Sequence, residues 1–178
     1  MKNTLAWIFA GAIFLVGCDG NTPLMKLAQD GDVAQIKAAI TAGAAIEERN
    51  KYGWTALMHA ARDGHVDAVR ALLDVGAKID VRDDNGRTAL ILAASKGHSE
   101  LVNLLVERGT SIDAVDENGW TGLFWAAHRG HIAVAKKLIA SGASINIRDP
   151  GGRSPMQVAK IEGRDEMLLL LEAAGGKY

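Results

Sequence analysis

Apolar residues along the chain follow a helical spacing in short, paired segments. After Thr55, which can cap a helix, Leu57 and Ala60 share one face of a segment that we expect to end near Gly64. In residues 66–73 the apolar positions are again three or four apart, so they form one stripe of a second helix. The pattern predicts two short helices joined by a tight turn, and such a pair cannot bury its stripe alone.

The same pair of helices is expected five times, because the chain repeats itself every 33 residues. Thr or Ser stands at 22, 55, 88, 121 and 154, and glycines recur at 20, 53, 86, 119 and 152, at 31, 64, 97, 130 and 163, and at 43, 76, 109, 142 and 175. Such glycines mark helix ends and turns that need positive φ or close approach. Paired alanines at 60 and 61, 93 and 94, and 126 and 127 predict close helix stacking. The Asn85-Gly86 pair is typical of the centre of a hairpin turn, so we predict a solenoid of helix–turn–helix–hairpin units.

The first residues have the pattern of a leader. A positive start precedes the apolar run Leu5–Val16, which is too short to span a bilayer because a spanning helix needs about 20 residues. Leu15–Cys18 resembles a bacterial lipoprotein box, which implies a signal peptide over 1–17 and a lipidated N-terminus, with acyl chains such as palmitate on Cys18, over 18–21. In Gram-negative bacteria, Asp19 would then favour the periplasmic side of the inner membrane. Ordinary cleavage nearby, giving a soluble periplasmic protein, and a buried thiol at Cys18 are the alternatives.

The repeated unit resembles an ankyrin repeat. The resemblance rests on the run Thr55–Ala61, on Gly64-His65, on Leu72-Leu73 and on Gly76-Ala77, and the units that begin at Thr88 and Thr121 share it. It implies an all-α ankyrin-repeat solenoid of about five 33-residue units over 22–178. The expected units are 22–49, 50–82, 83–115, 116–148 and 149–178.

The chain departs from the family pattern in two respects. The usual His of the first helix is replaced, so we expect its hydrogen-bond network to be absent; the replacing residues are Met25, Met58, Ile91, Phe124 and Gln157. The terminal units carry polar residues where inner units are apolar, which fits capping repeats with outer faces in water. These residues are Lys26 in the first unit and Lys160, Asp165 and Glu172 in the last.

Composition and motifs give little evidence for catalysis, metal binding or nucleic-acid binding. A formal charge of -1 over 178 residues gives no bulk attraction for nucleic acid, and a single cysteine excludes an internal disulfide and a four-cysteine zinc site. One repeat position holds His65, His98 and His131, which favours a shared structural role. His128 and His131 have a His-x-x-His spacing without an evident third ligand. We expect no catalytic residues, metal or cofactor; a hydrolase or metal enzyme using His128 and His131 is the alternative from a different class.

The family resemblance implies a binding surface on the hairpin tips and the exposed face of the first helices. The residues expected there are Lys51, Tyr52, Trp54, Arg62, Asp84, Asn85, Arg87, Lys96, Glu117, Asn118, Trp120, His128, Arg129 and Arg153. Trp, Tyr and Arg are enriched at interface hot spots, although Trp54 and Trp120 could instead pack over the next helix. We expect Trp125 in the core.

These expectations combine into a monomeric, non-enzymatic protein-binding module that is anchored to the bacterial envelope. It would bind a periplasmic protein on its concave face, bind no nucleic acid and touch the membrane only through its lipid. Its partner could be an enzyme that it supports or a toxin that it neutralises. A cytosolic adaptor, with residues 1–17 misread as a leader, is a further alternative.

Overall fold

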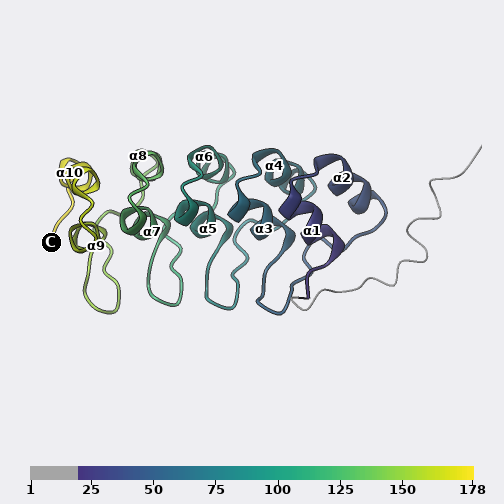
Figure 1. The fold of residues 1–178 in the computed structure, drawn as a ribbon, viewed down its shortest axis with the longest axis horizontal. Coiled ribbons are helices and arrows are strands. Elements are labelled where there is room, and N and C mark those ends of the chain that lie inside the picture. Colours follow the sequence, from purple (N-terminus) through teal and green to yellow (C-terminus); the bar gives the residue numbers. More distant parts are fainter. Residues whose placement is uncertain (1–19) are drawn as a thin grey trace, which may run out of the picture.

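The structure, a computed structural model, describes residues 20–178, which form ten α-helices in five pairs (Figure 1). In order they are α1 Pro23–Asp30, α2 Val33–Thr41, α3 Ala56–Asp63, α4 Val66–Asp74, α5 Ala89–Lys96, α6 Ser99–Glu107, α7 Gly122–Arg129, α8 Ile132–Ala140, α9 Pro155–Ile161 and α10 Asp165–Ala173. The predicted all-α class and the five helix pairs are confirmed. The signal peptide over 1–17 and the lipidation of Cys18 lie outside the described residues.

The helix pairs stack side by side into two rows. Figure 1 shows the odd-numbered helices in one row and the even-numbered helices in the other, with the hairpin loops projecting beyond the odd-numbered row. Each odd-numbered helix packs against the next odd-numbered helix, and the even-numbered helices do the same. Within residues 20–178, no helix combines the length and the apolar character that a membrane span requires.

Each odd-numbered helix begins at a hydroxyl cap. The Met58 backbone N–H donates to Thr55 Oγ1 at 3.4 Å, and Gly64, with φ +82°, ends α3 in the left-handed conformation. The four equivalent caps are Thr22, Thr88, Thr121 and Ser154. All fifteen glycines of the three repeated positions have positive φ, so the prediction made from their spacing is confirmed.

The hairpin turn differs by one residue from the prediction. The Gly86 N–H donates to the Asp83 carbonyl, and the Asp83 N–H donates to the Arg87 carbonyl, both at 2.9 Å. The central residues are therefore Asp84 and Asn85, and Gly86 closes the turn with φ +74°. Placing the Asn-Gly pair at the centre was wrong, because the Asp83 side chain fixes where the turn begins, as described below.

The core lies between the two rows of helices. The alanine pairs of α3, α5 and α7 are fully buried, and they allow these helices to stack closely. On α4, Val69 and Leu72 are fully buried, while Val66 and Leu73 pack against the same core from its margin. The predicted apolar stripe is thus confirmed, and α4 packs both on α3 of its own unit and on α2 and α6 of the neighbouring units.

A side chain in the turn between the two helices joins each unit after the first to the preceding one, and in three of the four junctions it is histidine. His98 Nε2 donates to the Arg62 carbonyl at 2.9 Å, which requires the proton on Nε2 because a carbonyl only accepts. The ring covers Gly64 so closely that a Cβ there would lie 2.7 Å from it. The equivalent bonds are His65 Nε2 to Gln29 O, His131 Nε2 to Ser95 O and, in the last unit, Arg164 Nε to His128 O. The predicted structural role of the three histidines is confirmed.

The network expected to be absent is present in the terminal units. Met25 Sδ accepts the Thr22 N–H at 3.4 Å, and Gln157 Oε1 accepts the Ser154 N–H at 2.8 Å, so each completes a capping box. The expectation was wrong there because a thioether and an amide oxygen can also accept this bond. In the three central units the equivalent side chains are buried and apolar; they are Met58, Ile91 and Phe124.

Carboxylates in the segments between the even-numbered helices and the hairpins also join successive units. Asp80 accepts hydrogen bonds from Thr110 Oγ1 at 2.6 Å and from the Ser111 N–H and hydroxyl at 3.1 and 2.8 Å. Burial raises the pKa of Asp80, but these bonds outweigh it and keep that pKa below its ordinary value. Glu47 accepts the Lys78 N–H at 2.8 Å in the same position of the preceding unit.

The terminal units differ from the inner ones as expected. Their polar residues are exposed: Lys26, Lys160, Asp165 and Glu172. Ile161 and Leu169 are also exposed, at 68% and 65%, so the last unit keeps apolar surface as well.

Replacing Gly64 with Ala is expected to destabilise the protein more than replacing Gly76 with Ala. Both positions have positive φ, so both variants carry a backbone strain of about 1–2 kcal/mol. A Cβ at Gly76 meets nothing within 4 Å, whereas at Gly64 it overlaps the His98 ring. Urea unfolding should show a further loss of about 1–3 kcal/mol for Gly64→Ala. Equal losses in the two variants would show that the His98 ring does not stay packed against Gly64.

Candidate functional site

A buried Asn or Asp begins each of the four hairpins and shapes it. Asp83 Oδ1 accepts the backbone N–H groups of Asn85 and Arg87 at 2.9 and 2.8 Å. The four residues are 5–8% exposed and occur every 33 residues: Asn50, Asp83, Asp116 and Asp149. We did not predict these anchors, although they repeat at the same interval as the glycines.

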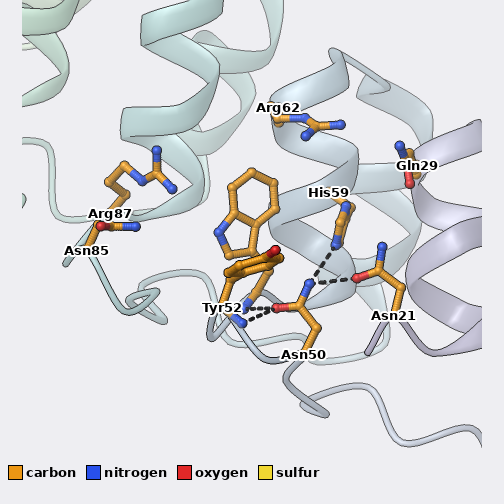
Figure 2. Close-up of a pocket in the computed structure, with 9 residues that line it drawn as sticks. Asn21, Gln29, Asn50, Tyr52, His59, Arg62, Asn85 and Arg87 are labelled. Atoms are coloured by element: carbon orange, nitrogen blue, oxygen red, sulfur yellow. Dashed lines mark hydrogen bonds between the residues drawn. The ribbon is translucent and has the colours of Figure 1, made fainter. Parts of the chain in front are cut away.

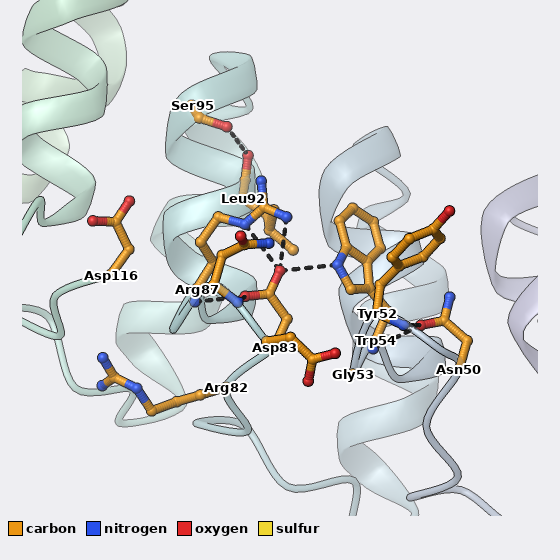
Figure 3. Close-up of polar contacts among 12 residues, drawn as sticks. Asn50, Tyr52, Gly53, Trp54, Arg82, Asp83, Arg87, Leu92, Ser95 and Asp116 are labelled. Atoms are coloured by element: carbon orange, nitrogen blue, oxygen red, sulfur yellow. Dashed lines mark hydrogen bonds and ion pairs between the residues drawn. The ribbon is translucent and has the colours of Figure 1, made fainter. Parts of the chain in front are cut away.

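The second oxygen of Asp83 joins two units. Figure 3 shows Trp54, from the preceding hairpin, and Arg87, from the same hairpin, converging on this carboxylate. Trp54 Nε1 and Arg87 Nε both donate to Asp83 Oδ2 at 2.9 Å. Because these charge-assisted bonds satisfy the carboxylate, its burial is tolerated.

The same arrangement recurs two units later at Asp149. Trp120 Nε1 and Arg153 Nε donate to Asp149 Oδ2 at 3.1 and 2.8 Å. Burial raises the pKa of Asp149, but hydrogen bonds from Arg153 and Trp120, together with the Arg153 charge, outweigh it and keep that pKa below its ordinary value.

The two alternate units have Trp54 and Trp120 where these hairpins have arginine, and a residue of the first helix takes the place of that arginine. Trp125 Nε1 donates to Asp116 Oδ2 at 2.9 Å. In the second unit, Asn50 Nδ2 donates to Asn21 Oδ1 at 2.6 Å and lies 3.5 Å from His59 Nε2 (Figure 2). The residue beside the buried Asn or Asp therefore alternates along the stack between an arginine of the hairpin and a side chain of the first helix.

Trp125 does not lie in the core, contrary to the expectation. It is half-buried on the hairpin side of α7, whereas its neighbour Phe124 is fully buried. Its ring packs edge-to-face against Trp120, with centroids 5.0 Å apart, and His128 lies 5.3 Å from Trp120. The Asp116 bond explains the outward orientation, because an indole N–H needs a partner when it is removed from water.

The two histidines of the His-x-x-His spacing are engaged separately. His128 Nδ1 is 3.3 Å from Glu162 Oε1, whereas His131 bonds to the Ser95 carbonyl. The described part of the chain contains no group of three His, Cys, Asp or Glu side chains that could hold a metal ion.

Trp54 has a structural role in the hairpin. It is only 8% exposed, and Arg62 and Arg87 cover its ring at 5.2 and 5.5 Å from the centroid. Tyr52 in the same hairpin is 51% exposed, and the Lys51 ammonium lies 5.0 Å from its ring centroid. The exposed aromatic of this hairpin is therefore Tyr52 and not Trp54.

Two adjoining hollows lie on the face formed by the hairpins and the odd-numbered helices, which is the face that we expected to be concave. The first, which we call the amide hollow, has a volume of about 280 Å³ and is lined by Asn21, Gln29, Asn50, Tyr52, Trp54, His59, Arg62, Asn85 and Arg87 (Figure 2). The second, the basic hollow, has a volume of about 660 Å³ and is lined by Trp54, Arg62, Arg87, Ile91, Leu92, Ser95, Lys96, Trp125, Arg129, His131 and Arg164. Both hollows share three residues: Trp54, Arg62 and Arg87.

The hollows bring together half of the residues predicted to bind a partner. Those lining one or both are Tyr52, Trp54, Arg62, Asn85, Arg87, Lys96 and Arg129. The others line neither: Lys51, Asp84, Glu117, Asn118, Trp120, His128 and Arg153. Sequence reasoning missed Arg164 in the basic hollow, because it stands where earlier units carry the joining histidine.

Replacing Trp54 with Phe is expected to lower the free energy of unfolding by about 1–2 kcal/mol, because Asp83 loses a buried donor while keeping Arg87. Tyr52→Ala serves as the control, since Tyr52 is exposed and its loss should cost within about 0.5 kcal/mol. Urea unfolding monitored by circular dichroism measures both. A Trp54→Phe variant as stable as the wild type would contradict the structural role of the indole N–H.

The repeated units of the stack match a known family of proteins. A family model described as ankyrin repeats in three copies matches residues 3–83, 24–116, 75–149 and 108–177, which together span nearly the entire chain. Comparison with curated proteins found no match. The five stacked helix pairs and their hairpins agree with the family match. The chain therefore belongs to the ankyrin-repeat family.

Proposed function

We propose that this protein is a non-enzymatic module that binds another protein on its concave face. Ankyrin repeats typically mediate protein binding and are usually non-catalytic. The observation that carries the proposal is the pair of adjoining hollows, which the Asp83 bonds hold in shape before any partner arrives. A preformed surface binds with less loss of conformational entropy than one that must be ordered.

The exposed residues around these hollows supply the contacts. Tyr52 is exposed beside the amide hollow, and Lys96 and Arg129 are exposed beside the basic hollow. Tyrosine and arginine give large contact area and several donors, which is why they are frequent in binding hot spots. Because Trp54 is fixed by Asp83, it forms the floor of the surface and not its contact tip.

We further propose that lipid on Cys18 anchors the stack to the periplasmic side of the inner membrane. The run Leu15–Cys18 supports this, as does the single cysteine of the chain. Several acyl chains give a stable anchor, since each buried methylene contributes about 0.8 kcal/mol. The partner is then a periplasmic enzyme that the stack supports or a toxin that it neutralises. A toxin predicts a tight one-to-one complex, whereas support predicts loss of the enzyme's activity when the stack is deleted.

The use of the concave face can be tested by capture of a partner from bacterial envelope extract. Tyr52→Ala combined with Arg129→Ala is expected to reduce recovery about tenfold, because hot-spot truncations each cost about 1–2 kcal/mol. Arg70→Ala combined with Lys136→Ala is the control, since both residues are exposed on even-numbered helices. Quantitative mass spectrometry of the captured protein measures recovery.

Equal recovery by the concave and the control variants, with both folded, would refute binding at this face. Enzymatic turnover by the purified protein that is lost in His128→Ala would instead support the enzyme alternative.

The anchor is tested separately by fractionation of cells. Cys18→Ser is expected to move the protein from the membrane fraction to a soluble fraction, because it removes the sulfur that would carry the lipid. Immunoblotting of the fractions and the mass of the purified wild-type protein provide the measurement. Wild-type protein found in the cytosol, or a Cys18→Ser variant that stays in the membrane, would overturn the lipid anchor.

A further inference from the structure

We propose that the basic hollow binds an acidic segment of the partner protein, with carboxylates over α5 and α7 and an apolar side chain on the floor between Trp54 and Trp125. This inference rests on the proposed protein-binding function and specifies the chemistry of the partner. Three observations support it. The charged side chains that line the hollow are all positive, three of these five have no carboxylate partner within residues 20–178, and the floor of the hollow is apolar.

The lining of the basic hollow has one sign of charge. Five lining residues are arginine or lysine, and none is aspartate or glutamate; the five are Arg62, Arg87, Lys96, Arg129 and Arg164. The chain as a whole has a formal charge of -1. The positive character of this surface is therefore a local property, produced by the placement of the charges.

Two of the five cations are neutralised within the protein. Arg62 donates to both oxygens of Asp63, at 2.9 and 3.0 Å, and Arg87 pairs with the buried Asp83 at 2.8 Å. These two arginines lie over the Trp54 ring and so form a wall of the hollow. They are not available to neutralise a bound carboxylate fully.

Within the described part of the chain, the other three cations form no ion pair of this kind. Lys96 and Arg129 are exposed in the last turns of α5 and α7, and Arg164 donates only its Nε–H, to the His128 carbonyl at 3.3 Å. Over residues 20–178, none of the three forms an ion pair with a carboxylate. The ends of two helices offer some partial negative charge, but the hollow keeps three positive groups for a carboxylate-bearing partner.

The floor of the hollow is apolar. Ile91 and Leu92 line it from α5, and the two indoles Trp54 and Trp125 line it from neighbouring units. A segment that places carboxylates on Lys96 and Arg129 can therefore bury an apolar side chain between them. This combination of charged rim and apolar floor is typical of protein interfaces.

A nucleic acid would also supply negative charge, but the hollow fits it less well. Stacking of successive bases needs several accessible aromatic faces. Of the two indoles in this hollow, Trp54 lies under two arginines and is almost fully buried, which leaves Trp125 alone. Phosphate tracking needs an extended basic stripe, whereas the adjoining amide hollow is lined mostly by neutral polar side chains. The observations therefore favour an acidic protein segment.

The proposal can be tested on the purified full-length chain in non-ionic detergent by fluorescence anisotropy. The probes are a labelled peptide of glutamate and leucine, the matching peptide with glutamine for glutamate, and a labelled oligothymidine. The glutamate peptide should bind more tightly than the glutamine peptide, and its binding should weaken as salt screens the charges. Lys96→Glu combined with Arg129→Glu should weaken it by about tenfold or more, the change that each 1.4 kcal/mol of lost binding produces.

Arg70→Glu combined with Lys136→Glu is the matched control, because it makes the same change in net charge on even-numbered helices. This control should bind the glutamate peptide as the wild type does, and thermal unfolding should show both variants folded. Equal binding of the two peptides, equal weakening in both variants or tighter binding of oligothymidine would each overturn the proposal. If partner capture still depended on the concave face, only the acidic specificity would then fail and the binding function would stand.

Discussion

The face that carries the two hollows depends on the hydrogen bonds of the buried carboxyl or amide group that begins each hairpin. A carboxylate removed from water is stable only when its oxygens are satisfied. Asp83 meets this requirement by holding the backbone of its own hairpin on one oxygen and Trp54 and Arg87 on the other. One side chain thus fixes the shape of a loop, the position of two large side chains and the junction of two units.

The use of acidic groups in the loops also explains how a nearly neutral chain presents a positive surface. Asp83 and Asp149 are buried in the hairpins, and Asp80 and Asp113, which follow α4 and α6, bond to the following unit. These carboxylates serve the structure, while Lys96 and arginines of the odd-numbered helices remain at the surface. Net charge averages over both groups, so composition alone gives no sign of this separation.

The helices and their ends could be predicted from the sequence because they depend on local features. Thr55 caps α3 and Gly64 ends it through bonds within a few residues, and both recur at a fixed interval. The roles of the tryptophans depend on the neighbouring unit and could not be predicted in the same way. A tryptophan at position 54 could equally well contact a partner or pack within the protein. Its packing role depends on its indole N–H, which donates to a carboxylate 29 residues later in the sequence. Trp125 follows the buried Phe124 by one position, and one step along a helix is enough to turn a side chain from the core toward the hairpin.

The residue that joins the last two units differs from the residue at the other junctions. Where the residue is His65, His98 or His131, the imidazole ring lies against a glycine of the preceding unit and bonds to a carbonyl of that unit. In the last junction Arg164 replaces the ring with a long, flexible chain that also reaches the basic hollow. The junction of the fourth and fifth units therefore forms part of the wall of that hollow, so the residue that holds the last unit in the stack also supplies one of its cations.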